Sequence, residues 1–495
     1  MTEDKTRDIM RKYQLKQLSE IKLKGVFMSE SSGLKRSIGL LPGLAILVGF
    51  VVGASIFVVP GELAAEIGPA VWLAYLIAGG LALTVCFVYA QIGSIIPASG
   101  ANYIFCTYTL GGYGGFLYMT FYLFVIVFLC PAMALGIGNY LVVFIPQLNI
   151  MLTAVMAMVV TGIINLLPTS FSSKIQTLAF AFVLLVVVLF GTGGIMNANW
   201  SNFVPMFPYG VGPVVATVLT CYFSFTGFNA LTEMSGEIKD PGKNIPRIVF
   251  LGFTVIMLLY GGVCVGLVAL IPAPELGVGA PMVLAAGQVF SGEWFGSALA
   301  IAAILGAWTS LNISIMSLSR DLYTLGKTRI LPRLFTKTNK SMTPYIAVVV
   351  ATIIGVGTIL VSQEIMGFIN MSSVFFMLVA IIVSVGSLRI KIMLPDRYEN
   401  AEYKLRGIWY YVWPVLAIGT TGYFLVDFLL KNQKDALFTI ISVAVAVGIY
   451  YLRKKSLIKN NIDIQKLLTE MLTGIDKDEE EEHEKEKEED AAKGR

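Results

Sequence analysis

The chain has 495 residues, of which 56% are hydrophobic and 14% are charged. Soluble globular proteins have about 45–50% apolar and about 25% charged residues, so this composition excludes a soluble globular protein and predicts an all-α polytopic membrane protein. The formal net charge of +4 is uninformative by itself, because the charges are unevenly distributed along the chain.

The first 37 residues are polar and charged and are expected to form a cytoplasmic arm without a cleavable signal sequence. Apolar segments near the roughly 20 residues that a membrane helix needs then recur along the chain. We predict twelve transmembrane helices. They cover residues 38–60, 70–92, 115–144, 150–168, 175–196, 212–232, 248–271, 296–318, 344–362, 367–388, 408–430 and 436–452.

Lysine and arginine indicate the orientation. If the N-terminus lies inside the cell, Lys431 and Lys434 are the only basic residues expected outside. This asymmetry follows the positive-inside rule, so we expect both termini to be cytoplasmic in a multi-pass protein of the plasma membrane. Residues 453–495 form a charged tail that is expected to be solvated and partly helical or disordered, with a regulatory role left open.

The residue types exclude several kinds of chemistry. The five cysteines lie in or beside apolar segments and are odd in number, so we expect no disulfide. The single histidine, His483, lies in the tail, which excludes a histidine relay or a histidine metal site inside the membrane. We therefore expect no enzyme, no cofactor and no metal.

Two of the expected spans contain residues that interrupt a helix. The first carries Gly49, Gly53 and Ser55 before Pro60, and the sixth carries Gly227. A broken helix in hydrocarbon leaves backbone N–H and C=O groups that need partners, and such groups can bind a substrate. The alternative is that the glycines only permit close helix packing.

The breaks lie five spans apart, which predicts two inverted repeats at 38–196 and 197–388, followed by two extra helices at 389–452. N–H groups near Ala54 and Ser55 suit a carboxylate, and carbonyls near Val51, Phe223 and Thr226 suit an ammonium group. An α-amino acid is the simplest molecule with both groups. Phe223 is a candidate aromatic lid.

Several ordered motifs resemble those of the amino acid–polyamine–organocation permeases. Gly53 to Phe57 is similar to the family's G-S-G-I-F signature, with Ser55 in place of the usual third glycine. The other matching segments are Tyr89 to Gly93 with Gln91 in place of glutamate, Pro97 to Tyr103, Glu237 to Pro246, Asn312 with Ser319 to Tyr323, Leu331-Pro332 and Thr343-Pro344. Three segments look most like the L-type amino acid transporters: Val48 to Pro60, Cys130-Pro131 and Gly227-Phe228-Asn229.

The resemblance implies the fold of the bacterial leucine transporter, with five plus five inverted spans, broken helices 1 and 6, and two more helices. By matching position it implies backbone contacts at Val51, Ala54 and Ser55, an aromatic gate at Phe223, and an amine contact at Thr226. Asn229 would link the sixth span to the pocket. The complete expected substrate site is Val51, Gly53, Ala54, Ser55, Ile56, Phe223, Thr226, Gly227 and Asn229.

Some resembling proteins have a lysine in span five that replaces a sodium ion, seven residues after a glutamine. Here the glutamine is Gln176 and the lysine position is Val183. A sodium site on Ser310 and Ser314 remains an alternative.

Acidic residues are expected only at span edges, at Glu62, Glu66, Glu233 and Asp427. We therefore predict sodium-independent exchange of neutral L-amino acids. The alternatives are a proton-coupled symporter and a sensor that signals through the tail.

The animal L-type exchangers join a glycoprotein subunit through a cysteine between spans three and four. Pro146 to Asn149 contain no cysteine, so no disulfide-linked subunit is expected. The expected partners are the amino acid and the lipid bilayer, with no nucleic acid. A homodimer is left open.

Overall fold

A computed structural model describes residues 38–53, 55–98, 100–167, 169–290, 293–327, 329–340 and 343–459, without the side chains of 169–174, 453, 454 and 456–459. These residues form helices and no β-strand; a single parallel bridge joins Ile38 and Ile238. Within the described residues, ten helical segments are long and apolar enough to cross a membrane, and two shorter apolar helices accompany them. The all-helical membrane architecture is thus confirmed.

The elements follow in chain order. The first broken span is α2 (Leu40–Val52) and α3 (Ser55–Ile67), and the second is α8 (Val211–Ala216), α9 (Val218–Phe223) and α10 (Phe228–Glu233). The continuous apolar helices are α4 (Val71–Ile95), α5 (Ala101–Leu141), α6 (Ile150–Ile164), α7 (Thr169–Met196), α11 (Pro241–Leu270), α13 (Trp294–Lys327), α14 (Tyr345–Val361), α15 (Ile365–Ser387), α18 (Trp409–Lys431) and α19 (Gln433–Lys459). Short connecting helices are η1 (Trp200–Phe203), η2 (Ser235–Glu237), η3 (Ala273–Leu276), α12 (Pro281–Val289), η4 (Arg333–Thr336), α16 (Ile390–Met393) and α17 (Pro395–Asn400).

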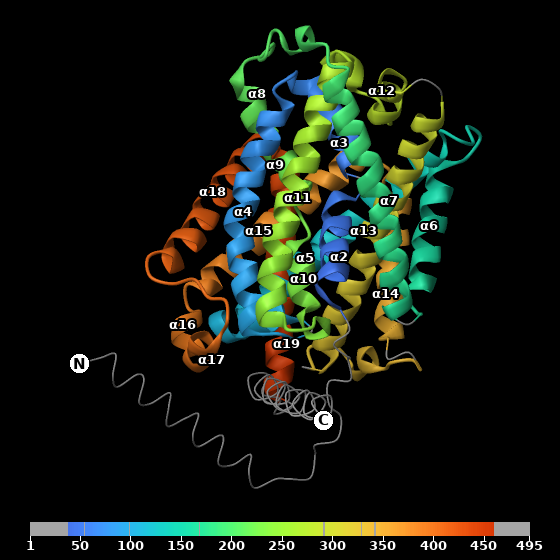
Figure 1. Cartoon of the computed structure of the whole chain (residues 1–495). Coiled ribbons are helices and arrows are strands. Elements are labelled where there is room, and N and C mark those ends of the chain that lie inside the picture. The colour runs from blue at the N-terminus through green and yellow to red at the C-terminus, as the bar shows by residue number, and fades with distance from the viewer. Residues whose placement is uncertain are drawn as a thin grey trace, which may run out of the picture. The chain divides into compact units, whose positions relative to one another are not determined.

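Burial divides the helices into central and peripheral ones. The most apolar window of the first span is 88% buried, whereas the windows of α18 and α19 are 28% and 17% buried. Figure 1 shows α18 and α6 at opposite margins, with α2, α10 and α13 between them. The central helices contact protein on all sides, and the last two present apolar side chains outward, as lipid contact requires.

Two helices extend beyond their predicted limits. Helix α5 begins at Ala101, 14 residues before the predicted start at 115, and bends at Gly111, whose φ of 80° and ψ of 176° are not helical. Helix α13 continues to Lys327, nine residues past the predicted end at 318. Both extensions carry polar residues that an apolar-window criterion rejects, yet most of them are buried against neighbouring helices.

Both predicted breaks are present, at Gly53 and around Gly227. Gly53 has φ 39° and Gly227 has φ 121°, values that L side chains rarely adopt. A Cβ on Gly53 would overlap the Ser310 side chain, and one on Gly227 would lie 2.6 Å from the Phe50 ring. Glycine therefore lets the first break pack closely against Ser310 of α13 and lets the second break pack closely against the end of α2.

Replacing Gly227 by alanine is expected to destabilise the protein by about 3 kcal/mol or more, since strain at positive φ adds to overlap with Phe50. The measurement is thermal unfolding of the detergent-purified protein. The control is Gly80→Ala in α4, where an added Cβ meets nothing within 4 Å and the melting temperature should stay equal or rise. Equal melting temperatures for Gly227→Ala and wild type would contradict the assignment of this break.

Candidate functional site

A small buried cavity lies where the two breaks meet. Its volume is about 10 Å³, about the space of one water molecule. Its lining comes from α2, α3, α5, α9, the segment after α9 and α13: Phe50, Val51, Gly53, Ser55, Leu129, Met133, Phe223, Thr226 and Ser310. An amino acid can enter only if this lining moves.

Five predicted site residues line this cavity: Val51, Gly53, Ser55, Phe223 and Thr226. Ile56, Gly227 and Asn229 are not among its lining residues, and Ala54 lies outside the described residues. The structure adds Leu129 and Met133, which flank the Cys130-Pro131 motif, and Ser310. That motif was the sequence signal for the contribution of α5.

The carbonyls released at the first break already have hydrogen-bond donors. The Ser55 hydroxyl donates to the Val52 carbonyl at 3.1 Å and lies 2.6 Å from the Tyr260 hydroxyl, while Tyr260 also reaches the Val51 carbonyl at 3.3 Å. The Ser55 hydroxyl thus stabilises the break itself. Tyr260, in α11, was not predicted, because its distance from the break along the chain hides the contact.

The same arrangement repeats around the cavity. Thr226 donates to the Phe223 carbonyl at 2.7 Å, Thr309 to the Gly49 carbonyl at 2.9 Å, and Ser310 to the Phe50 carbonyl at 2.5 Å. The Phe223 carbonyl also accepts the Thr226 amide at 3.0 Å, and the Gly49 carbonyl also accepts the Gly53 amide at 3.4 Å. Each carbonyl has two lone pairs, so these two carbonyls must exchange a donor before they can bind a substrate.

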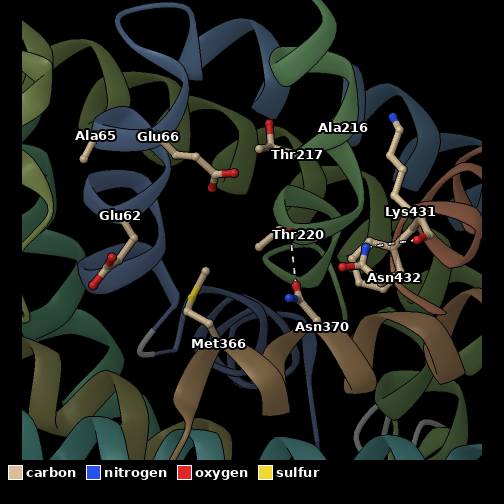
Figure 2. Close-up of a pocket in the computed structure, with 11 residues that line it drawn as sticks. Glu62, Ala65, Glu66, Ala216, Thr217, Thr220, Met366, Asn370, Lys431 and Asn432 are labelled. Carbon is tan, nitrogen blue, oxygen red and sulfur yellow. Dashed lines mark hydrogen bonds between the residues drawn. The ribbon is translucent and has the colours of Figure 1, made fainter. Parts of the chain in front are cut away.

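A larger hollow of about 590 Å³ lies beyond α9, on the side of α3. Thr220 lines this hollow and Phe223, one helical turn later, lines the small cavity. Figure 2 shows Glu66 and Thr217 facing into the hollow and the hydrogen bond of 3.0 Å between Thr220 and Asn370. About one turn of α9 therefore separates a roomy polar space from the meeting point of the breaks.

The opposite side is closed by a seal, defined here as the contacts of Ile38, Gly100, Glu233, Glu237 and Arg320. The Ile38 amide donates to the Glu237 carbonyl at 3.0 Å, and the Gly100 amide donates to the Glu233 carbonyl at 3.1 Å. Arg320 pairs with Glu237 at 3.2 Å, with both side chains 4% exposed. Three of the sequence motifs thus meet in one closure.

Glu233 lies at the edge of its span, as predicted, but it is not exposed there. Glu233 and Asp321 are both 0% exposed. Glu233 ends α10, and Asp321 lies in the part of α13 beyond the predicted span, so the early start of α5 and the loop before it can cover them. Glu62 and Glu66 do line the hollow, and Asp427 pairs with Lys431 at 2.7 Å.

Asn229 is fully buried, and its carbonyl accepts a hydrogen bond from the Asn102 amide at 3.3 Å. Val183 is 4% exposed and places no charge in α7. Gln176 instead connects α7 to α13, because its amide approaches the Thr309 carbonyl at 3.4 Å.

Comparisons with known proteins agree with this architecture. The methylthioribose transporter of Bacillus subtilis (strain 168) is 27% identical over 462 residues, which span 87% of this chain and 96% of that protein. The branched-chain amino acid permease BcaP of the same organism is 26% identical over 344 residues, 64% of this chain and 73% of that protein. Cationic amino acid transporter 9, chloroplastic, of Arabidopsis thaliana is 27% identical over 338 residues, 62% of this chain and 58% of that protein.

The sequence profile described as amino acid permease matches residues 38–433, which include both breaks, the seal and the hollow. The profile covers most of the chain, and the relatives are transporters of amino acids and related molecules. The chain therefore belongs to the amino acid permease family, a group of membrane transporters within the amino acid–polyamine–organocation superfamily.

Proposed function

We propose that this permease exchanges neutral L-amino acids across the plasma membrane by alternating access, without sodium, at the cavity between the two breaks. The observation that carries the proposal is that both glycine breaks border the same buried cavity. Helix α3 begins there with Ser55, and its first N–H groups suit a carboxylate. The Val51 and Phe223 carbonyls suit an ammonium group that replaces the hydroxyl donors of Tyr260 and Thr226.

The lining favours an uncharged substrate side chain. None of the nine lining residues carries a charge, and Leu129, Met133 and Val51 offer apolar surface. A cationic side chain would lose its hydration there without gaining a counter-charge, which is unfavourable. The relatives' names span a thiosugar, branched-chain and cationic amino acids, so the cavity, and not the comparison, supports the neutral class.

The sodium-independent part of the proposal rests on hydroxyl groups. Thr309 and Ser310 donate hydrogen bonds to the carbonyls of Gly49 and Phe50, so these protons occupy carbonyl lone pairs that a sodium ion would need. The predicted alternative used Ser310 and Ser314, but Ser314 donates to the carbonyl of Ser310 at 2.8 Å.

We further propose twelve spans arranged as two inverted repeats of five plus two extra helices, with α6 and α14 as the shorter spans. Both termini then lie in the cytoplasm, the 590 Å³ hollow opens outward, and the seal faces inward. One side open and one side closed is the arrangement that alternating access requires. The chain would work without a disulfide-linked subunit, as a monomer or a homodimer.

Counterflow in liposomes tests the function. Reconstituted protein preloaded with a mixed pool of neutral amino acids should accumulate labelled leucine, alanine or serine with no ion gradient, in choline as in sodium buffer. Protein-free liposomes are the control. No uptake from any preload would contradict exchange.

Ser55→Gly is expected to broaden the range of accepted amino acids, because it removes a hydroxyl and bulk from the lining. It also removes the hydrogen bonds to Val52 and Tyr260, so we expect a lower melting temperature, by the equivalent of about 1 kcal/mol. Competition of unlabelled amino acids against labelled exchange measures the range. An unchanged competition profile would show that the hydroxyl does not restrict the substrate.

The buried carboxyl groups of Glu233 and Asp321 favour a proton-coupled symporter as the second candidate. The two candidates differ in liposomes that contain no amino acid. An acidic outside buffer would drive accumulation by a symporter, whereas an exchanger would show no accumulation without preload.

A further inference from the structure

Glu233 and Asp321 form a carboxyl pair within the seal. Both side chains are 0% exposed, and their carboxyl groups lie within hydrogen-bonding reach of each other. Glu233 is the last residue of α10, and its backbone carbonyl accepts a hydrogen bond from the Gly100 amide. The carboxyl pair therefore lies directly beside a seal contact.

Few polar groups offset the cost of burying the two carboxyl groups. One oxygen of Glu233 accepts hydrogen bonds from Asn102 at 2.8 Å and from the Tyr118 hydroxyl. The other oxygen of Glu233 and both oxygens of Asp321 have no hydrogen-bond partner in the described structure. The hydroxyl of Tyr89, buried close enough to interact with Glu233, also has no partner.

The surrounding elements supply no free positive charge to the described part of the site. Helix α5 adds Tyr122 and Cys106, and α2 contains no titratable side chain. The guanidinium of Arg320, the residue before Asp321 in α13, binds Glu237 of η2. On α11, Lys243 and Arg247 are exposed, as is Arg333 of η4.

Electrostatics then sets the protonation of the pair. One buried carboxylate without a cation costs several kcal/mol, and two in contact also repel each other. A proton held between them removes the repulsion and supplies the donor that the bare oxygens of Asp321 require. Since the amide of Asn102 and the hydroxyl of Tyr118 point hydrogens at Glu233, a metal cation is disfavoured at that oxygen.

We propose that Glu233 and Asp321 form a proton-binding site that holds the seal closed, with the proton released as the seal opens. Opening admits water to the pair, and hydrated carboxyl groups ionise at neutral pH. This inference rests on the alternating access of the proposed function, but it is independent of the amino acid carried and of net proton flux.

The sign of the pH dependence follows from proton counting. The closed seal binds one proton more than the open seal, so raising the pH favours opening. For one proton, the ratio of open to closed molecules should rise about tenfold per pH unit, until the closed pair itself loses its proton.

Hydrogen exchange of the full-length protein in detergent measures this ratio directly. The amides of Ile38, Gly100 and Lys239 are bonded across the seal and exchange when it opens. After correction for intrinsic exchange rates, their protection in wild type should fall about tenfold per pH unit. In the double variant Glu233→Gln with Asp321→Asn, which keeps the shape of both side chains, protection should not change with pH.

Glu402→Gln is the matched control, because Glu402 is a half-exposed carboxylate that pairs with Lys243 at 3.3 Å. In this variant the protection of the seal amides should fall with pH as steeply as in wild type. If the double variant fails to fold, the single variants Asp321→Asn and Glu233→Gln replace it. A dependence of protection on pH that is at most half as steep as in wild type, in each of them, would support the carboxyl pair.

The proposal would be overturned if protection in wild type did not change with pH, or if protection in the folded double variant fell with pH as steeply as in wild type. Protection that depended on the sodium concentration and not on pH would also overturn it. Because hydrogen exchange needs no transport, a failed counterflow assay with a preserved slope would refute only the exchange function.

Discussion

Arg320→Met is expected to lower the stability of the closed state by about 3–5 kcal/mol, the cost of leaving one partner of a buried ion pair without its counter-charge. Glu237, whose side chain is 4% exposed, would lose the cation that pairs with it. The measurement is the thermal unfolding of the purified protein, together with hydrogen exchange of the Ile38 amide across the seal. Both should report a loosened seal.

Lys431→Met is the matched control for this charge deletion. Lys431 pairs with Asp427 at 2.7 Å, but its side chain is 52% exposed, so water screens the pair and the change should stay within about 0.5 kcal/mol. If Arg320→Met were as stable as Lys431→Met, the ion pair would not be a structural element of the seal.

Phe223→Ala is expected to reduce exchange at least tenfold, equivalent to about 1.4 kcal/mol in the rate-limiting step. Phe223 is 2% exposed and lies in the last turn of α9 between the hollow and the cavity, so its removal opens a path across the proposed gate. Counterflow per unit of folded protein, with the substrate affinity measured in parallel, tests this expectation.

A control must separate the effect of Phe223→Ala on protein stability from its effect on the proposed gate. Phe190→Ala in α7 serves this purpose, because Phe190 is 0% exposed and does not line the cavity. Each truncation should destabilise the protein by about 3–5 kcal/mol, but only Phe223→Ala should slow exchange by folded protein. Unchanged affinity together with unchanged exchange in Phe223→Ala would remove the gate assignment.

The breaks could be predicted because their signal is local. Gly53 and Gly227 weaken a helix whatever surrounds them, and the apolar segments around them are long enough to show that a helix is interrupted. The same local signal explains why Val51, Phe223 and Thr226 could be named before the cavity was visible.

The sequence by itself determined the membrane class, the helical segments and the two breaks, because apolar length and glycine act within one segment. Only the tertiary structure decided where the polar groups find partners. Tyr260 reaches Ser55 from α11, and Asp321 reaches Glu233 from α13. In both contacts the two residues are far apart along the chain, by nearly 90 positions in one case and by more in the other. The burial of a side chain likewise depends on the helices that pack around it. For that physical reason Glu233 reads as an edge residue in the sequence and is a buried carboxyl in the fold.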